Sequence, residues 1–166
     1  MKKTAVPSIL VAMMSLALGV SAEAQQTKKV PRVGFLIASS ASSQESRLEA
    51  FRQGLRQLGY IEGQNIVIEL RSGEGKAERL PVVTAELVQL KVDAIVTGGS
   101  TSTHAAKEAT ETIPIVMTQD ADPVTDGFVA SLARPGGNIT GLSRLGPELS
   151  GKRLELLRRS FLNSPV

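Results

Sequence analysis

Short apolar segments alternate with segments of helical periodicity along most of this 166-residue chain, and this alternation constrains the fold more than any other feature. Four segments are predicted to be strands: Val33–Ile37, Ile66–Leu70, Ala94–Thr97 and Ile115–Met117. Helices are predicted between them from apolar residues spaced three or four apart: Leu48, Phe51, Leu55 and Leu58, then Leu80, Val83, Leu87 and Leu90, with a third helix over Ser102–Thr110. This βαβαβαβ order predicts an α/β fold, in which a parallel sheet with right-handed crossovers has the strand order 2-1-3-4.

The character of the sequence changes beyond the fourth predicted strand, where Gly, Asp and Pro become frequent. We expect a short helix over Gly127–Leu132, a brief strand over Ile139–Leu142 and a final amphipathic helix over Glu148–Phe161. The chain is therefore expected to have three parts after its leader: an N-terminal α/β lobe over 30–120, a crossing segment over 121–145 and the truncated start of a second lobe over 146–166. The alternative is a self-contained flavodoxin-like domain whose last helix packs on the sheet.

The first 24 residues have the three parts of a secretory signal peptide in the correct order. Lys2 and Lys3 are basic, Ile9–Val20 is mostly apolar, and Ala22-Glu23-Ala24 has the small residues of a cleavage site. The apolar run is shorter than the roughly 20 residues of a spanning helix. We therefore predict cleavage after Ala24 and export to the periplasm, with a buried N-terminal helix as the alternative. Because the chain has no cysteine, a lipid anchor on cysteine is excluded and a freely diffusing protein is favoured.

The charge balance argues against nucleic acid as a partner. Removing Lys2, Lys3 and Glu23 with the signal peptide leaves 17 basic and 15 acidic residues. Nucleic-acid binding needs a concentrated positive surface. The one basic cluster, around Lys152 and Arg158, has the spacing of the solvent-facing side of a helix.

Two loops of small polar residues, Ala38–Ser43 and Gly98–Thr103, follow the first and third predicted strands. In open α/β sheets, ligands bind outside the carboxyl ends of the strands. Helices begin at that edge, and their free N–H groups attract anionic groups. The loops therefore predict one wall of a site for a small polar molecule. Helix capping by Ser100–Ser102 and Ser42–Gln44 explains the same composition, and both interpretations remain open.

Catalytic, cofactor and metal sites are not indicated. "GGSTS" at residues 98–102 lacks the last glycine of a nucleophile elbow. His104 is the only histidine, and its place at a helix start is typical of a surface residue. "SGEGKAER" has the spacing of neither a phosphate loop nor a dinucleotide-binding turn. We predict a non-enzyme with no cofactor, no catalytic residue and no metal ligand.

Two longer motifs, "GLRQLGYIEGQNI" and "SLARPGGNITGLS", are similar to motifs of the substrate-binding proteins of ABC importers. The resemblance covers residues 31–162 and is strongest to the branch that includes tryptophan and tyrosine import proteins. It implies the type I periplasmic binding fold, in which two α/β lobes close over a ligand. Members are usually about twice as long as this chain, so the resemblance also implies that the second lobe is largely missing.

The resemblance also implies a set of ligand-binding residues: Ser39, Ser40, Gly99, Ser100, Thr101, Asp120, Asp122 and Thr140. Asp122 begins the family's Asp-Pro-Val, and Thr140 lies in its Asn-x-Thr-Gly. Ser100 and Thr101 stand where relatives often have Thr-Pro, which leaves a shared ligand open. Hydroxyls and helix N–H groups suit the carboxylate of an amino acid, and an aspartate suits its ammonium group. Asp122 has a second interpretation as a turn residue before proline.

The sequence therefore predicts a solute receptor that delivers a small polar ligand, with amino acids as candidates, to an ABC permease in the inner membrane. One alternative is a non-functional fragment without a working cleft. The other is an exported α/β enzyme of unknown substrate.

Overall fold

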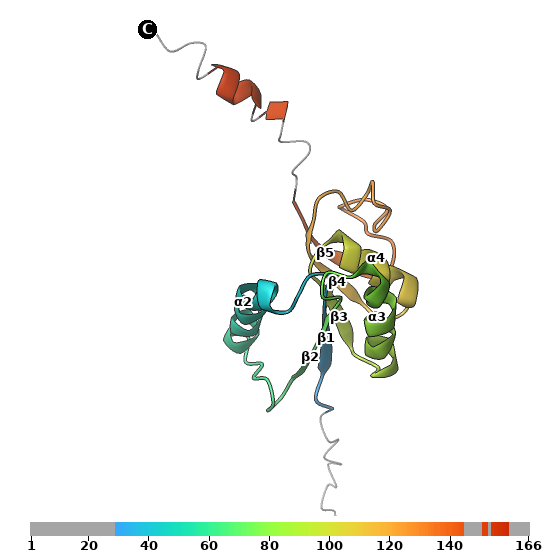
Figure 1. The fold of residues 1–166 in the computed structure, drawn as a ribbon. Helices are drawn as coiled ribbons and strands as arrows, with labels where there is room; N and C mark the ends of the chain where they lie inside the picture. The colour runs from blue at the N-terminus through green and yellow to red at the C-terminus, as the bar shows by residue number, and fades with distance from the viewer. Residues whose placement is uncertain (1–28, 145–150, 153, 160–166) are drawn as a thin grey trace, which may run out of the picture.

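The computed structural model describes residues 29–144, 151–152 and 154–159, and its centre is a five-stranded parallel sheet (Figure 1). The strands lie in the order β2-β1-β3-β4-β5. Their bounds are β1 Arg32–Ile37, β2 Val67–Ser72, β3 Ala94–Thr97, β4 Ile115–Asp120 and β5 Ile139–Ser143. The predicted parallel pairing and the order 2-1-3-4 are confirmed.

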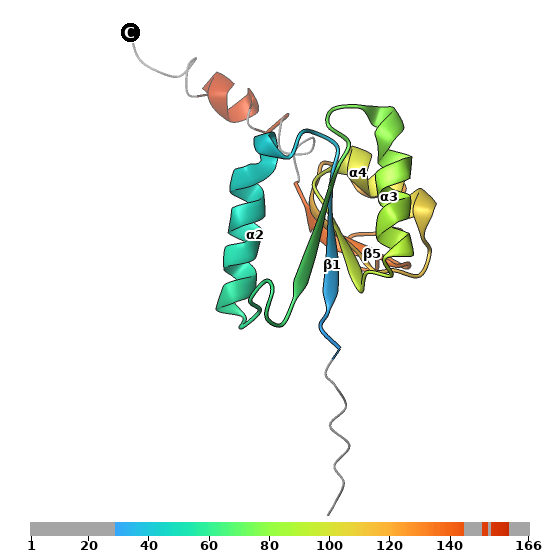
Figure 2. The ribbon, with the colours of Figure 1, turned by 60° about the horizontal axis from the view of Figure 1, so that its bottom comes forward.

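Three α-helices connect the first four strands and cover both faces of the sheet. They are α2 Glu45–Gln57, α3 Leu80–Gln89 and α4 Ser100–Ala109, with short 3₁₀ turns before α2 (η1, Ser42–Gln44) and α3 (η2, Ala77–Arg79). Figure 2 shows α2 alone on one face, and α3 and α4 together on the other. Helix α4 begins two residues before the predicted start at Ser102, so the serine and threonine residues after β3 form its first turn.

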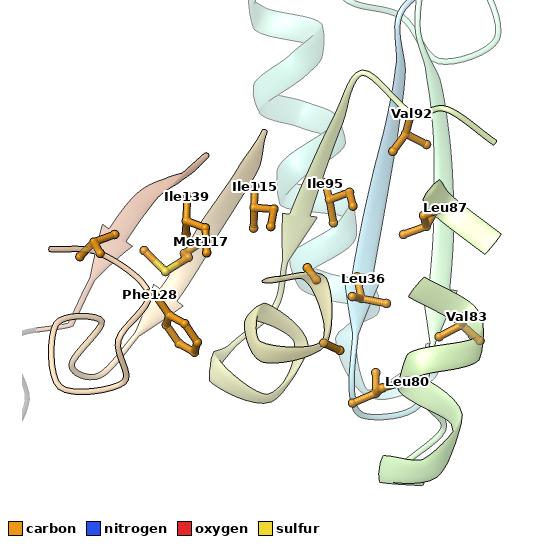
Figure 3. Packing of buried hydrophobic residues seen from close by; sticks show 13 residues of the cluster. Leu36, Leu80, Val83, Leu87, Val92, Ile95, Ile115, Met117, Phe128 and Ile139 are labelled. Atoms are coloured by element: carbon orange, nitrogen blue, oxygen red, sulfur yellow. The ribbon is translucent and has the colours of Figure 1, made fainter. Parts of the chain in front are cut away.

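The larger part of the core lies between the sheet and the α3–α4 pair (Figure 3). Leu36, Ile95 and Ile115 project from three adjacent strands and are completely buried in the same cluster as Leu87 of α3. Each such side chain stabilises the fold by about 1.5–3 kcal/mol relative to an exposed one. A smaller cluster on the opposite face joins α2 to the sheet, where the rings of Phe35 and Phe51 are 5.2 Å apart.

The segment between β4 and β5 is a series of turns, so the helix predicted over Gly127–Leu132 is wrong. The N–H groups of Phe128 and Val129 both bond to the carbonyl of Pro123, and Gly127 has φ of 69°, which interrupts right-handed helical geometry. The apolar residues that suggested a helix belong to the core instead, because Phe128 and Val129 are buried in the same cluster as Met117.

Strand β5 extends the sheet past residue 120, where the sequence analysis ended the lobe. It pairs with β4 in parallel, with an irregularity between Met117 and Asp120. Gly141 lies opposite Met117 with φ of 142°, and a Cβ at this position would be 2.1 Å from the Met117 carbonyl oxygen. Only glycine allows the two strands to approach so closely.

Residues 151–152 and 154–159 are helical, within the predicted helix Glu148–Phe161. Leu154, Leu156 and Leu157 of this helix are 52–67% exposed. The two ends of the predicted helix and the predicted signal peptide lie outside the described residues. Within the described ranges, no helix is long and apolar enough to cross a membrane.

Candidate functional site

The carboxyl ends of β1, β3 and β4 meet at one edge of the sheet, because these strands are parallel neighbours. Ser39 and Ser40 follow β1, Gly99 precedes α4 at the end of β3, and Asp120 ends β4. The fold thus brings together most of the predicted site residues from three separate stretches of sequence.

The loop after β1 presents its two serines half-buried. The Ser39 carbonyl accepts a hydrogen bond from the Ser72 hydroxyl at 2.7 Å, which ties the loop to the end of β2. The Ser40 carbonyl accepts bonds from the amide and hydroxyl of Ser43. These backbone contacts fix the loop and leave the Ser40 hydroxyl with a single weak contact, at 3.3 Å, to Ser42.

The first turn of α4 supplies hydroxyl and N–H groups to the same edge. Gly99 is the N-cap residue, Ser100 is half-buried and Thr101 is exposed. The first N–H groups of a helix have no partner within the helix and carry its positive dipole end. Thr103 points into the core, where its hydroxyl contacts that of Thr97 at 2.8 Å.

Helix capping does not explain the small polar residues of either loop. The N-cap residues of η1, α2 and α4 are Ala41, Gln44 and Gly99, and none makes a side-chain cap hydrogen bond. The hydroxyls of Ser100 and Thr101 therefore have no capping role in the described structure, which favours the interpretation as a binding wall.

Asp120 is the least solvated polar group at this edge, with 1% of its surface exposed. Among the described residues, neither carboxylate oxygen has a hydrogen-bond partner, and the buried Ser102 hydroxyl also has none. Burial raises the pKa of Asp120 above its usual value, and the negative charge of Asp126 adds to this. The nearby Ser100 hydroxyl opposes the rise. A buried carboxyl group without a donor is expensive to ionise, so this site favours a positively charged or donating group.

Asp122 is in the opposite situation, although it lies only two residues away. Its Oδ1 accepts a hydrogen bond from the Thr125 amide at 3.0 Å, which closes the turn that follows. Hydrogen bonds from the Thr125 side chain and backbone lower the pKa of Asp122. The structure therefore gives this aspartate the turn role that the sequence left open.

Thr140 is not grouped with the other candidates. It is exposed on β5 and is paired with Val116, whereas Asp120 is paired with Ser143. Four residues of strand separate these positions along β4, or roughly 13 Å. Ser143 therefore occupies the end of β5 at the candidate site, and the sequence pattern contained no signal for this register.

Gln119 is a second residue that the sequence analysis missed. Its Oε1 accepts a hydrogen bond from the Arg144 guanidinium at 2.7 Å, and its Nε2 lies 3.5 Å from the carbonyl of Gly98. Gln119 lines a cavity of about 220 Å³ on the α2 side of the edge, together with Arg47 and Phe51. The sequence signal for Gln119 was a polar residue directly after an apolar strand segment. The sequence analysis chose the neighbouring Asp120 and Asp122 instead.

The histidine and the acidic side chains of the described residues form no candidate metal site. His104 is exposed on α4, with its ring edge-on to Phe128 at 5.1 Å between centroids. Within the described ranges there is no group of three or more His, Cys, Asp or Glu side chains that could hold a metal ion. The edge offers hydrogen bonds and charge, which suit reversible binding.

Several known proteins are similar to this chain in sequence and in fold. A curated tyrosine-binding protein of Clostridioides difficile is 33% identical over 117 residues, which are 70% of this chain and 34% of that protein. A conserved domain protein from Vibrio cholerae has a similar structure, with a TM-score of 0.72 and 29% identity over 81% of this chain and 45% of the other. A Streptococcus pneumoniae ABC domain in complex with L-Trp has a TM-score of 0.64 and 26% identity, over 68% and 38% of the two chains.

The coverage shows that this chain spans about a third of the curated relative and less than half of each solved structure. The parallel sheet matches part of each, as expected for one lobe of a binding protein. The family model described as ABC transporter substrate binding protein matches residues 32–163, and the chain therefore belongs to the family of ABC transporter substrate-binding proteins.

Proposed function

We propose that this chain is the ligand-capturing lobe of a solute receptor for an ABC importer, and that its ligand is an amino acid. The observation that carries the proposal is the buried Asp120, which has no hydrogen-bond partner among the described residues and lies near the hydroxyl-rich start of α4. Two relatives support the ligand class, because one is named as tyrosine-binding and another was solved with L-Trp.

Both charged groups of an amino acid, the carboxylate and the ammonium group, would find complementary groups at this edge of the sheet. Its carboxylate would accept hydrogen bonds from the N-terminal N–H groups of α4 and from the hydroxyls of Ser100 and Thr101. Its ammonium group would donate to Asp120. Ser39 and Ser40 would contact the ligand from the β1 side of the edge. Asp122 and Thr140 are weaker candidates. The Asp122 carboxylate closes a turn, and Thr140 lies away from the edge.

The rest of the proposed transport role concerns the whole protein. A signal peptide over residues 1–24 would direct export to the periplasm, where the receptor would meet a permease of the inner membrane. Residues 30–120 would form most of the first lobe, and the crossing segment 121–145 would add β5 to its sheet. Residues 146–166 would start a second lobe that supplies the opposite wall of the cleft. The greater length of the relatives supports the presence of a second lobe in the whole protein.

A thermal-shift titration of the full chain with the twenty amino acids tests the proposal. A ligand that binds only the folded state stabilises it by about 2.7 kcal/mol when present at 100 times its Kd. Stabilisation by one or a few amino acids, lost in Thr101→Val and kept in the control Thr112→Val, is the expected result. The absence of any shift up to millimolar concentrations would contradict it and favour a non-functional fragment.

A further inference from the structure

The cavity of about 220 Å³ that Gln119 lines adjoins the candidate site but belongs to the other side of the sheet edge. Its lining comes from α2, from β1 and β4, and from Gly98 at the end of β3. Gly98 is two residues from Ser100, and Gln119 directly precedes Asp120. Because consecutive Cα atoms are about 3.8 Å apart, the cavity lies within a few ångströms of the groups proposed to hold the ligand backbone.

The end of β4 is irregular, and this irregularity gives the cavity a polar wall. The register on either side of it places Thr118 and Gln119 of β4 opposite the single residue Leu142 of β5. In a regular strand, successive side chains lie on opposite faces of the sheet. Thr118 and Gln119 nevertheless both line the cavity. Bulges of this kind redirect side chains and are frequent beside binding and active sites.

Gln119 and Gly98 present a donor and an acceptor close together in this cavity. The Arg144 guanidinium donates to Oε1 of Gln119 at 2.7 Å, which leaves the amide nitrogen Nε2 for a further partner. Within the described residues, Nε2 makes one long contact, at 3.5 Å, to the carbonyl oxygen of Gly98. These two atoms are close enough for one hydroxyl group to donate to the carbonyl and accept from Nε2.

Arg47 adds positive charge at the mouth of the cavity. It is exposed on α2 and donates from Nη1 to the Gln44 side chain at 2.9 Å. A guanidinium has further N–H donors beyond the one in this bond. A partly negative oxygen in the cavity would therefore be stabilised from the α2 side as well as by Gln119.

Aromatic rings form another part of the lining. Phe35 is buried and Phe51 is half-buried, and their ring centroids are 5.2 Å apart with the planes tilted by 48°. Aromatic rings attract a further ring in an offset or edge-to-face arrangement. The cavity volume equals about seven water molecules at roughly 30 Å³ each, which is of the order of one substituted aromatic ring.

One amino-acid side chain combines these properties. The phenol of tyrosine is an aromatic ring whose single oxygen both donates and accepts a hydrogen bond. Phenylalanine has no polar group, the indole N–H of tryptophan is a donor only, and the donor and acceptor of histidine are different ring atoms.

We propose that this cavity is the side-chain subsite of the receptor, and that Gln119 selects the phenol group of tyrosine. The ligand backbone would lie at Asp120 and the start of α4, and its ring would extend to the α2 side of the edge, against Phe51. The assignment of the cavity to the ligand rests on the proposed function. The affinity of the cavity for a phenol does not.

The cavity is tested first without an amino acid, by titrating the full chain with p-cresol, which is the tyrosine side chain alone. The side-chain amide signals of Gln119 should shift in a saturable way in NMR spectra, and toluene should shift them less. The amide of Gln57, exposed on α2 outside the cavity, is the control and should not move. A Gln119 amide that does not respond to p-cresol, or that responds equally to toluene, would overturn the proposal.

The selection of tyrosine is tested by calorimetry with L-tyrosine and L-phenylalanine. The full chain should bind tyrosine about tenfold more tightly or better, because a hydrogen-bonding site rejects the analogue that leaves its polar groups unpaired. Gln119→Leu should remove this preference by weakening tyrosine binding alone, and Gln57→Leu should retain it. Arg47→Met, at an exposed position, should reduce the preference, and it serves as the second variant if Gln119→Leu does not fold.

The outcomes separate this inference from the proposed function. Equal affinity for the two amino acids, or a preference that Gln119→Leu leaves unchanged, would refute the role of Gln119 while the proposed function stands. A cavity that binds p-cresol in a chain that binds no amino acid would refute the assignment of the subsite together with the proposed function.

Discussion

The face of the sheet that α3 and α4 cover buries thirteen hydrophobic residues in one cluster, whereas the face that α2 covers buries four. The second face is also open over β5, where Leu142 is 70% exposed and Thr140 is exposed beside it. The comparison indicates that the α3–α4 face carries most of the stability of the lobe. It also indicates that the start of α4, which lies on the strongly packed face, is a rigid support for a binding site.

The largest loss of stability is expected from a substitution in β5, at the point where this strand packs against β4. Gly141→Ala should destabilise the lobe by about 4 kcal/mol or more, because the new Cβ would overlap the Met117 backbone at 2.1 Å. Urea unfolding measures the change. Gly137→Ala is the matched control, since a Cβ at that position meets nothing within 4 Å. Equal stability of the two variants would show that the close approach of β5 to β4 is not needed.

A pair of leucine substitutions compares the two faces directly. Leu87→Ala on α3 should lower the free energy of unfolding by about 2–5 kcal/mol, because the side chain is completely buried. Leu48→Ala, at the only buried position of α2, should cost less, because fewer buried side chains surround the cavity that it leaves. Chemical denaturation of both variants under one condition gives the difference. A larger loss for Leu48→Ala would reverse the proposed ranking of the faces.

The smallest effect is expected on the open part of the α2 face. Leu142→Ser removes an exposed side chain and should change the free energy of unfolding by about 0.5 kcal/mol or less. The urea midpoint of the full chain measures it. A loss of several kcal/mol would mean that Leu142 is covered in solution, and that the two faces are more alike than the described residues indicate.

The strands, their order and the three helices could be predicted, because strands covered on both faces are apolar at nearly every position and helices repeat at 3.6 residues. The segment from Gly127 to Leu132 could not, because Phe128 and Val129 have the same spacing whether they lie on a helix or in a turn that reaches the core. Local pattern predicted a brief strand over Ile139–Leu142, where β5 lies, but not its register, which depends on the irregularity at Met117 and on the contact that Gly141 permits.

The sequence could predict that the candidate site lies at the carboxyl edge of the sheet. It could not predict which side-chain groups at that edge are available to a ligand. The loops that hold Ser39, Ser40, Ser100 and Thr101 follow strands, and parallel strands place such loops together. The sequence could not distinguish Asp120 from Asp122, because the two differ in burial and in the hydrogen bonds that Asp122 accepts from Thr125. These properties depend on how the turn folds back over α4, which no short-range pattern specifies.

The most direct test of the account is the response of the backbone amide NMR signals of the full chain to L-tyrosine and L-tryptophan. The account predicts that the signals of Ser39, Ser40, Gly99, Ser100, Thr101 and Asp120 shift in a saturable way, while those on the α3–α4 surface away from the edge remain in place. The absence of any shift at millimolar amino acid, or shifts confined to the groove that Pro81, Val88 and Ala109 line between α3 and α4, would contradict it.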